Sequence, residues 1–139
     1  MMSSMRASGT FKVVAFTPTP SAPDPTMTAD HTLGVATIRK LYEGEIAGRS
    51  ATSFVAALGR RAGLGPYLAM ESFEGTLDGR AGAFDFAHAP TTGPAAWSPN
   101  FFRILPTSGT GRLAGIHGSG GMAIDADGTH RIWFDYELS

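Results

Sequence analysis

Glu71 is the side chain in this sequence with the clearest capacity for acid–base chemistry. In an extended strand, Ala69 and Phe73 would share its face. The opposite face would carry Leu68 and Met70, so Glu71 has apolar neighbours whichever face is buried. Because an apolar setting disfavours the charged form, we expect a raised pKa that suits a general acid or base. The alternatives are an exposed glutamate and a buried glutamate paired with an arginine.

Two further side chains, His88 and Tyr136, can transfer protons, and each lies in a strand whose same face carries apolar residues. Phe84, Phe86 and His88 alternate along one run, which predicts an inward stripe ending in an imidazole. Tyr136 shares a face with Phe134 in the last run and could donate a hydrogen bond to a ligand oxygen. The alternatives are a hydrogen-bonded structural histidine and a packing tyrosine whose hydroxyl is bound to backbone.

Substrate binding is assigned to an arginine and a set of phenylalanines. Arg103 lies in an apolar run, where it could bind a carboxylate, pair with Glu71 or be solvated. The predicted binding set is Arg103, Phe73, Phe84, Phe86, Phe102 and Phe134. Glu43 and Glu45 could form a second carboxylate cluster, although a solvated face explains them as well.

Composition excludes several classes of site. The chain has no cysteine, which rules out disulfides, thiolate nucleophiles and cysteine-bound metals. The histidines His31, His88, His117 and His130 show no short ligand spacing, so no metal is expected. The segment 109–114 spells Gly-x-Gly-x-x-Ala, but no helix pattern follows it, and a dinucleotide site needs one. We therefore expect no cofactor.

Charge and hydropathy also limit the partners and the compartment. The formal net charge is −1, and the only basic cluster is Arg60-Arg61 with Arg49 upstream, so no nucleic-acid partner is expected. No apolar run approaches the roughly 20 residues of a membrane span, and no secretory signal opens the chain. We expect a soluble, cytoplasmic protein.

The elements that would position these side chains are short strands between glycine and proline turns. Strands are predicted at residues 11–16, 35–46, 50–58, 67–77, 81–88, 101–105, 111–116, 122–124 and 130–138. Residues 78–79 and 127–128 are Asp-Gly hairpin signals, residues 59–66 a connection, and loops are expected at 18–30 and 89–99. Residues 50–58 also fit a helix capped by Ser50, but Thr52 and Val55 favour a strand.

A weak internal repeat indicates how these strands close. Residues 44–48, 75–79 and 111–115 share the pattern Gly-x-Ile/Leu-Ala/Asp-Gly, which combines a strand bend with a tight turn. About eight strands with open edges would aggregate. We therefore expect an all-β fold, a single closed antiparallel barrel domain spanning residues 1–139.

The sequence also resembles the DUF3224 family. The matching segments are ASGTF (7–11), YEG (42–44), ESFEGTL (71–77), GRAGAF (79–84), PTSGTGRLAGI (106–116) and FDYEL (134–138). The fold of that family is similar to the allene oxide cyclase barrel, so the resemblance implies an eight-stranded barrel, often in a homo-oligomer. The wider superfamily includes cofactor-free cyclases, isomerases and dirigent proteins. The chain lacks the cysteine of the plant cyclase pocket, so that chemistry is not transferred.

Three functions follow as hypotheses. The first is a cofactor-free isomerase or cyclase that takes a small hydrophobic or amphipathic molecule and uses Glu71 with His88 or Tyr136. The second is a barrel that binds or carries such a ligand without catalysis. The third is a barrel filled by its own side chains that acts through its oligomer surface. The sequence leaves the ligand and the number of subunits open.

Overall fold

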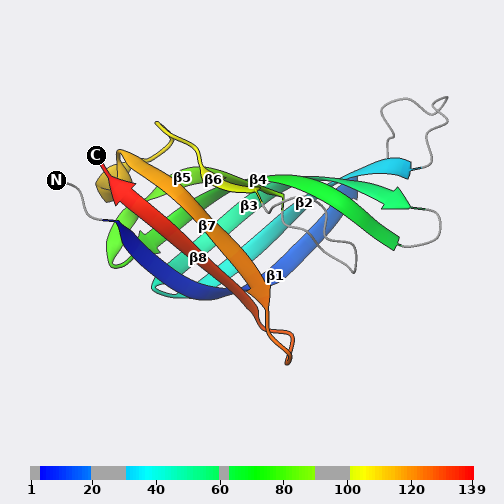
Figure 1. Ribbon diagram of the computed structural model, residues 1–139, viewed down its shortest axis with the longest axis horizontal. Helices are drawn as coiled ribbons and strands as arrows, with labels where there is room; N and C mark the ends of the chain where they lie inside the picture. The colour runs from blue at the N-terminus through cyan, green and yellow to red at the C-terminus, as the bar shows by residue number, and fades with distance from the viewer. Residues whose placement is uncertain (1–3, 20–30, 60–62, 90–100) are drawn as a thin grey trace.

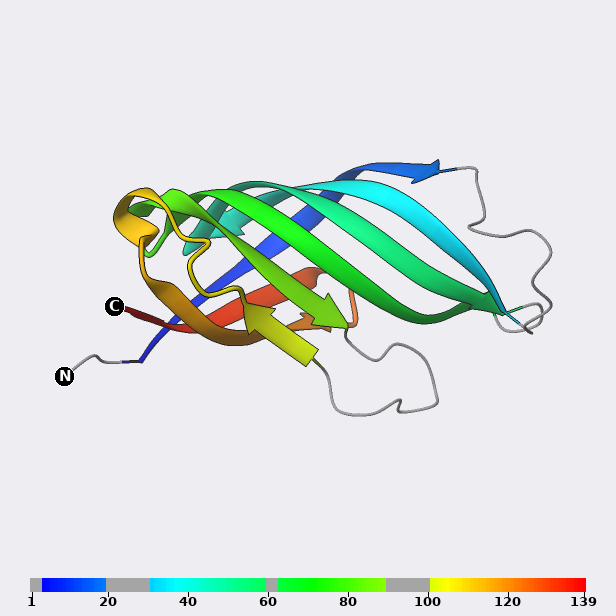
Figure 2. The same cartoon turned by 90° about the horizontal axis from the view of Figure 1, so that it is seen from above.

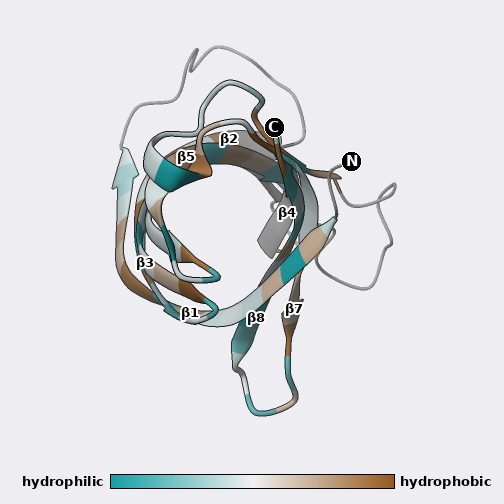
Figure 3. Ribbon diagram, turned by 90° about the vertical axis from the view of Figure 1, so that its left-hand side faces the viewer, coloured by the Kyte–Doolittle hydropathy of each residue, from teal (hydrophilic) through white to brown (hydrophobic). Residues whose placement is uncertain are grey.

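The chain forms one closed antiparallel β-barrel, as predicted. The computed structural model describes residues 4–19, 31–59, 63–89 and 101–139. Within these residues the strands are β1 (Met5–Thr19), β2 (His31–Gly44), β3 (Ile46–Gly59), β4 (Gly63–Leu77), β5 (Arg80–Ala89), β6 (Phe101–Ile104), β7 (Ile116–Ile124) and β8 (His130–Leu138). They pair in chain order and β8 returns to β1, which closes the ring (Figures 1 and 3). No helix in this part of the chain is long and apolar enough to cross a membrane.

Several predicted boundaries are wrong: β2 ends at Gly44 and β3 begins at Ile46, and the predicted strand at 122–124 is the end of β7. Two further differences have a clear local cause. Residues 111–116 are not a strand: they begin with the 3₁₀ turn η1 (Gly111–Leu113), where the Leu113 amide donates to the carbonyl of Thr110 at 3.0 Å. Pro18 lies in β1 instead of a loop, opposite Ala36 of β2. A proline is tolerated there because β8 pairs with β1 only as far as Phe11. Residues 20–30 and 90–99 of the predicted loops lie outside the described residues.

Residues 50–58, for which a helix was the alternative, belong to β3 as predicted. The predicted connection at 59–66 is shorter than expected, since β3 runs to Gly59 and β4 starts at Gly63.

Large apolar side chains fill one end of the barrel, which we call the plugged end. It lies beside the start of β1, the end of β8 and η1 (Figures 1 and 2). The largest side chains buried there are Ile46, Phe73, Leu77, Phe84, Leu113, Ile116 and Tyr136, each at most 1% exposed. An eight-stranded barrel is just wide enough for side chains of this size to fill. This end therefore provides the rigid core.

The segment between β6 and β7 completes the wall at the plugged end. β6 has only four residues, so it leaves the first half of β5 without a strand partner on that side. Thr110 bonds to Ala83 in both directions, with its amide donating at 2.8 Å and its Oγ1 accepting at 3.1 Å. The amide of Asp85 donates to Ser108 Oγ at 3.0 Å. The SGTG stretch thus pairs with β5 where a longer β6 would.

The opposite end, which we call the distal end, has smaller inner residues. β4 pairs with β5 only from Ala69 onward, so β2, β3 and β4 extend beyond the closed ring (Figure 2). Their inner faces carry the buried alanines Ala36, Ala56 and Ala69. A β-bulge between Val13 and Ala15 turns Phe16 to the inner face, opposite Ile38, yet Phe16 is 55% exposed.

Two glycines allow strands β3 and β4 to approach closely. Gly48 and Gly75 face each other across the pair. A Cβ atom on Gly48 would lie 2.3 Å from the carbonyl oxygen of Glu74, and the φ of Gly48 is +147°. Both the space and the backbone conformation therefore require glycine at this position.

Gly48→Ala should lower the free energy of unfolding by more than about 3 kcal/mol, because the clash adds to the backbone strain. Gly79→Ala is the matched control: its φ is +81° but nothing lies within 4 Å of the added Cβ. It should cost about 1–2 kcal/mol. Urea unfolding of both variants checks this, and equal losses would contradict the close-approach explanation.

Candidate functional site

A buried carboxylate with four polar partners lies on the inner face of the barrel. Glu71 of β4 is 0% exposed. Its Oε1 lies 2.9 Å from Lys40 Nζ and 3.1 Å from His88 Nε2. Its Oε2 accepts hydrogen bonds from Ser50 Oγ at 2.5 Å and from the Tyr42 hydroxyl. We call these five residues the polar cluster.

Strand alternation brings the polar cluster together. Lys40 and Tyr42 are two residues apart on β2, so both point inward. Ser50 of β3 is the direct cross-strand partner of Lys40. His88 reaches Glu71 from β5, where it faces Ala69, one inner position further toward the distal end. Each donor therefore comes from a strand that neighbours β4 or lies one strand beyond it.

The environment of Glu71 keeps the carboxyl group ionised. Burial is the largest effect and acts to raise its pKa, as the sequence prediction assumed. The hydrogen bond from His88, the charge of Lys40 and the hydrogen bonds from Ser50 and Tyr42 act in the opposite direction. Together they lower the pKa from its usual 4.5 to about 2. The prediction of a raised pKa is therefore wrong, since Glu71 has polar partners where apolar neighbours were expected.

The two tyrosines near Glu71 stay protonated. Burial, and then the Glu71 charge, raise the pKa of Tyr42 well above its usual value. The same two causes, in the same order, raise the pKa of Tyr67 to about 12. Tyr42 is therefore a neutral donor to the carboxylate, and Tyr67 is a neutral aromatic wall beside His88, with ring centroids 6.2 Å apart.

The ionised carboxylate determines the role of one ring nitrogen of His88. A carboxylate only accepts hydrogen bonds, so Nε2 of His88 must carry a proton to bond to it. The other ring nitrogen, Nδ1, is buried and has no hydrogen-bond partner among the described residues. The arrangement is a carboxylate–imidazole pair with one ring nitrogen available.

The remaining predicted residues divide into three groups. Phe73, Phe84, Phe86, Phe102 and Phe134 are all buried on the inner face. Tyr136 is also buried, but its hydroxyl donates to Asp78 at 2.5 Å in the β4–β5 turn, so it does not join the polar cluster. Arg103 lies on the outer face and is exposed, which matches the solvated alternative. It neither pairs with Glu71 nor joins the predicted binding set inside the barrel. Glu43 and Glu45 are exposed too.

Sequence reasoning missed three partners of Glu71. Lys40, Tyr42 and Ser50 were not predicted as site residues, although Lys40 alternates with Ile38 and Tyr42 on one strand face. A lysine between an isoleucine and a tyrosine on an inward face needs a buried counter-charge. Glu71 is the buried carboxylate that could supply it, and that reasoning would have paired the two.

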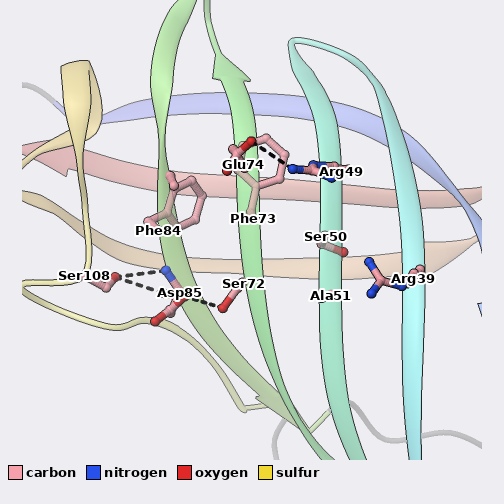
Figure 4. Close-up of a pocket in the computed structure, with 11 residues that line it drawn as sticks. Arg39, Arg49, Ser50, Ala51, Ser72, Phe73, Glu74, Phe84, Asp85 and Ser108 are labelled. Carbon is pink, nitrogen blue, oxygen red and sulfur yellow. Dashed lines mark hydrogen bonds and ion pairs between the residues drawn. The ribbon is translucent and has the colours of Figure 1, made fainter.

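Polar side chains also line a pocket of about 300 Å³ on the outer face of β2–β5 (Figure 4). Two polar contacts span its lining. Arg49 pairs with Glu74 at 3.3 Å, and Ser72 donates to Asp85 at 2.6 Å. No three histidine, aspartate or glutamate side chains in the described part of the chain are placed to hold a metal ion. The polar cluster is therefore the stronger candidate site.

The low pKa of Glu71 predicts how stability depends on pH. A depressed folded-state pKa contributes stability above the usual value of 4.5 and loses it as pH falls toward 2. The free energy of unfolding should fall by about 3 kcal/mol across that window on account of Glu71. Glu71→Gln should flatten the pH dependence there, measured by urea unfolding at a series of pH values.

The control for that measurement is Glu74→Gln, an exposed glutamate on the outer face of the same strand. It should leave the slope between pH 2 and 5 nearly unchanged, because exposed pairs contribute little. Equal slopes for the wild type and Glu71→Gln would contradict an ionised Glu71.

Comparison with known proteins agrees with this fold. A solved structure from Shewanella oneidensis MR-1, described as a protein with unknown function from the DUF3224 family, superposes with a TM-score of 0.79. It is 26% identical, and the alignment covers 99% of each chain. No curated protein matches the chain. The model of the family described as Protein of unknown function (DUF3224) matches residues 7–136, so the chain belongs to the DUF3224 family.

Proposed function

We propose that this protein binds one small, mostly apolar organic molecule inside the barrel, between the polar cluster and the distal end. The observation that carries the proposal is a pair of buried polar atoms, His88 Nδ1 and Thr52 Oγ1, that have no hydrogen-bond partner among the described residues. Buried polar atoms are normally paired, and an unpaired one costs about 1–3 kcal/mol. A ligand that enters the barrel would supply the missing partners.

The surroundings of these atoms fit an apolar guest. At the distal end the inner face carries the small side chains of Ala36, Ala56 and Ala69, which occupy little of the interior. Phe54 and Tyr67 lie there as a half-buried aromatic pair with ring centroids 4.8 Å apart. Ligand sites are typically apolar and aromatic with a few placed polar groups. The distal half of the interior has that composition, whereas the plugged half is filled.

The proposed activity is a cofactor-independent isomerisation or cyclisation by proton transfer. His88 supplies a proton acceptor held by a carboxylate, and the Lys40 ammonium supplies positive charge beside it. The apolar walls would hold the guest in a reactive conformation. The resemblance to allene oxide cyclase-like barrels supports the same reading. The alternative is binding without catalysis. A protein that binds the molecule but shows no activity in an assay would support that alternative.

The binding proposal is tested with N-phenyl-1-naphthylamine, a neutral fluorescent probe. We expect saturable binding, seen as increased emission, at one site per chain. Ala69→Leu adds volume on the inner face beside His88 and should weaken binding at least tenfold. Ala51→Leu adds the same volume on the exposed outer face of β3 and should leave binding unchanged. Absence of saturable binding, or equal affinity in both variants, would contradict the proposal.

A second proposal concerns the outer surface of the barrel. It follows from the expectation of a homo-oligomer, which came from the family resemblance. Val35, Val55 and Leu68 form a cross-strand row on the outer faces of β2, β3 and β4. Leu68 is 66% exposed, and Met70 next to it on that face is 54% exposed. Contiguous exposed apolar patches of this kind are typical of protein contacts. We propose that a second copy of the chain covers this row.

Sedimentation velocity tests the oligomer. The wild type should sediment as more than a monomer, and Leu68→Lys should shift it toward the monomer because a charge would be buried in the contact. Ala51→Lys, also on the outer face of β3, serves as the control. A monomeric wild type would rule the contact out.

A further inference from the structure

We propose that His88 is the proton acceptor of this site, acting through Nδ1, and that Glu71 is a positioning residue which does not itself exchange the proton. The substrate class that fits is a planar, mostly apolar molecule with a single weakly acidic O–H, N–H or carbonyl-activated C–H bond. This inference rests on the proposed function, because it names the group that acts in the same interior site.

The hydrogen-bond geometry separates the two roles. Both oxygens of Glu71 are already engaged: Lys40 and His88 contact Oε1, and Ser50 and Tyr42 contact Oε2. A carboxylate held by four donors, with a pKa of about 2, is a very weak base. The Nδ1 atom of His88 is the opposite case, since it is buried and has no partner among the described residues.

The ring contacts of His88 define the shape of the guest. The imidazole stacks with Phe86 at 5.6 Å and 26°, and with Phe102 at 5.7 Å and 22°. Tyr67 meets it edge-on at 6.2 Å and 88°. These contacts fix the ring plane, so the Nδ1 lone pair has one direction. An aromatic or conjugated molecule would pack against the same rings while its acidic hydrogen meets Nδ1.

The proton transfer balances without any cofactor. The O–H, N–H or C–H bond of the substrate breaks, its electron pair stays on the substrate, and the proton forms a new bond to Nδ1. His88 becomes an imidazolium whose Nε2–H still bonds to the Glu71 carboxylate. The substrate anion and the imidazolium form an ion pair, so the interior as a whole keeps the charge it had before the transfer.

A matched pair of probes tests this step: 4-nitrophenol, which has the acidic O–H, and 4-nitroanisole, its methyl ether, which has none. Wild-type protein should bind 4-nitrophenol at least tenfold more tightly. The bound probe should show the phenolate absorption band at a pH where the free probe is mostly protonated. This comparison needs no variant, so it stands even if a substitution in the cluster prevents folding.

Two variants assign the roles. His88→Phe keeps an aromatic ring and removes the acceptor, so it should bind both probes alike and lose the phenolate band. Glu71→Gln can still accept from Nε2 but lacks the charge that stabilises the imidazolium, so it should bind both probes and weaken the band. A merely structural Glu71 would leave the band unchanged in any folded variant.

Each further outcome has one meaning. If both probes bind wild-type protein equally and no phenolate band appears, the assignment of His88 is overturned and the binding function stands. If neither probe binds, the proposed binding function is overturned and the assignment with it. If the band persists in folded His88→Phe, another group accepts the proton and the assignment to His88 is overturned.

Discussion

The Glu71 carboxylate carries a negative charge at a point in the barrel that solvent does not reach, and an unpaired charge there would cost several kcal/mol. Lys40 neutralises it, and His88, Ser50 and Tyr42 take up its remaining hydrogen-bonding capacity. Because Lys40 is also buried, each charge is tolerated only in the presence of the other. Lys40 Nζ additionally lies 4.6 Å from the ring centroid of Phe11, a contact that favours a cation. The inner residues of β1 through β5 are thus arranged around one carboxylate.

The division of the interior into two halves gives the polar cluster its position. The plugged end holds Phe73, Phe84 and the Tyr136–Asp78 hydrogen bond, and the SGTG segment completes its wall. That rigid half fixes the backbone of β4 and β5, and therefore the placement of Glu71 and His88. The distal half combines the small inner residues Ala36, Ala56 and Ala69 with the half-buried rings of Phe54 and Tyr67, and a guest molecule would have to enter there. A filled half that supports a less filled one is what a preorganised site requires.

Strand alternation explains why the fold and much of the inner face could be predicted from the sequence. The parity of Phe84, Phe86 and His88 predicted an inward stripe, and all three are buried. Parity also grouped Ala69, Glu71 and Phe73 on one face but left open which face is interior, and the structure places that face inside. Parity gives the face of a residue but not its height in the barrel, so Tyr136 was assigned to the site although its hydroxyl lies at the β4–β5 turn. It also fails across a bulge, which is how Phe16 comes to face inward. The lowered pKa of Glu71 could not be predicted from the sequence. It depends on donors from β2, β3 and β5, and the sequence does not give the register of these strands.

The account depends on one proposed feature of His88: a proton on Nε2, which bonds to Glu71, and a lone pair on Nδ1, which has no partner among the described residues. Nitrogen-15 NMR of the imidazole rings at neutral pH measures this directly, with the His88 signals assigned by their loss in His88→Phe. We expect a neutral ring with a protonated Nε2 and an unprotonated Nδ1. A signal from a doubly protonated ring, or from a ring protonated on Nδ1 alone, would contradict the assignment of His88 as a proton acceptor.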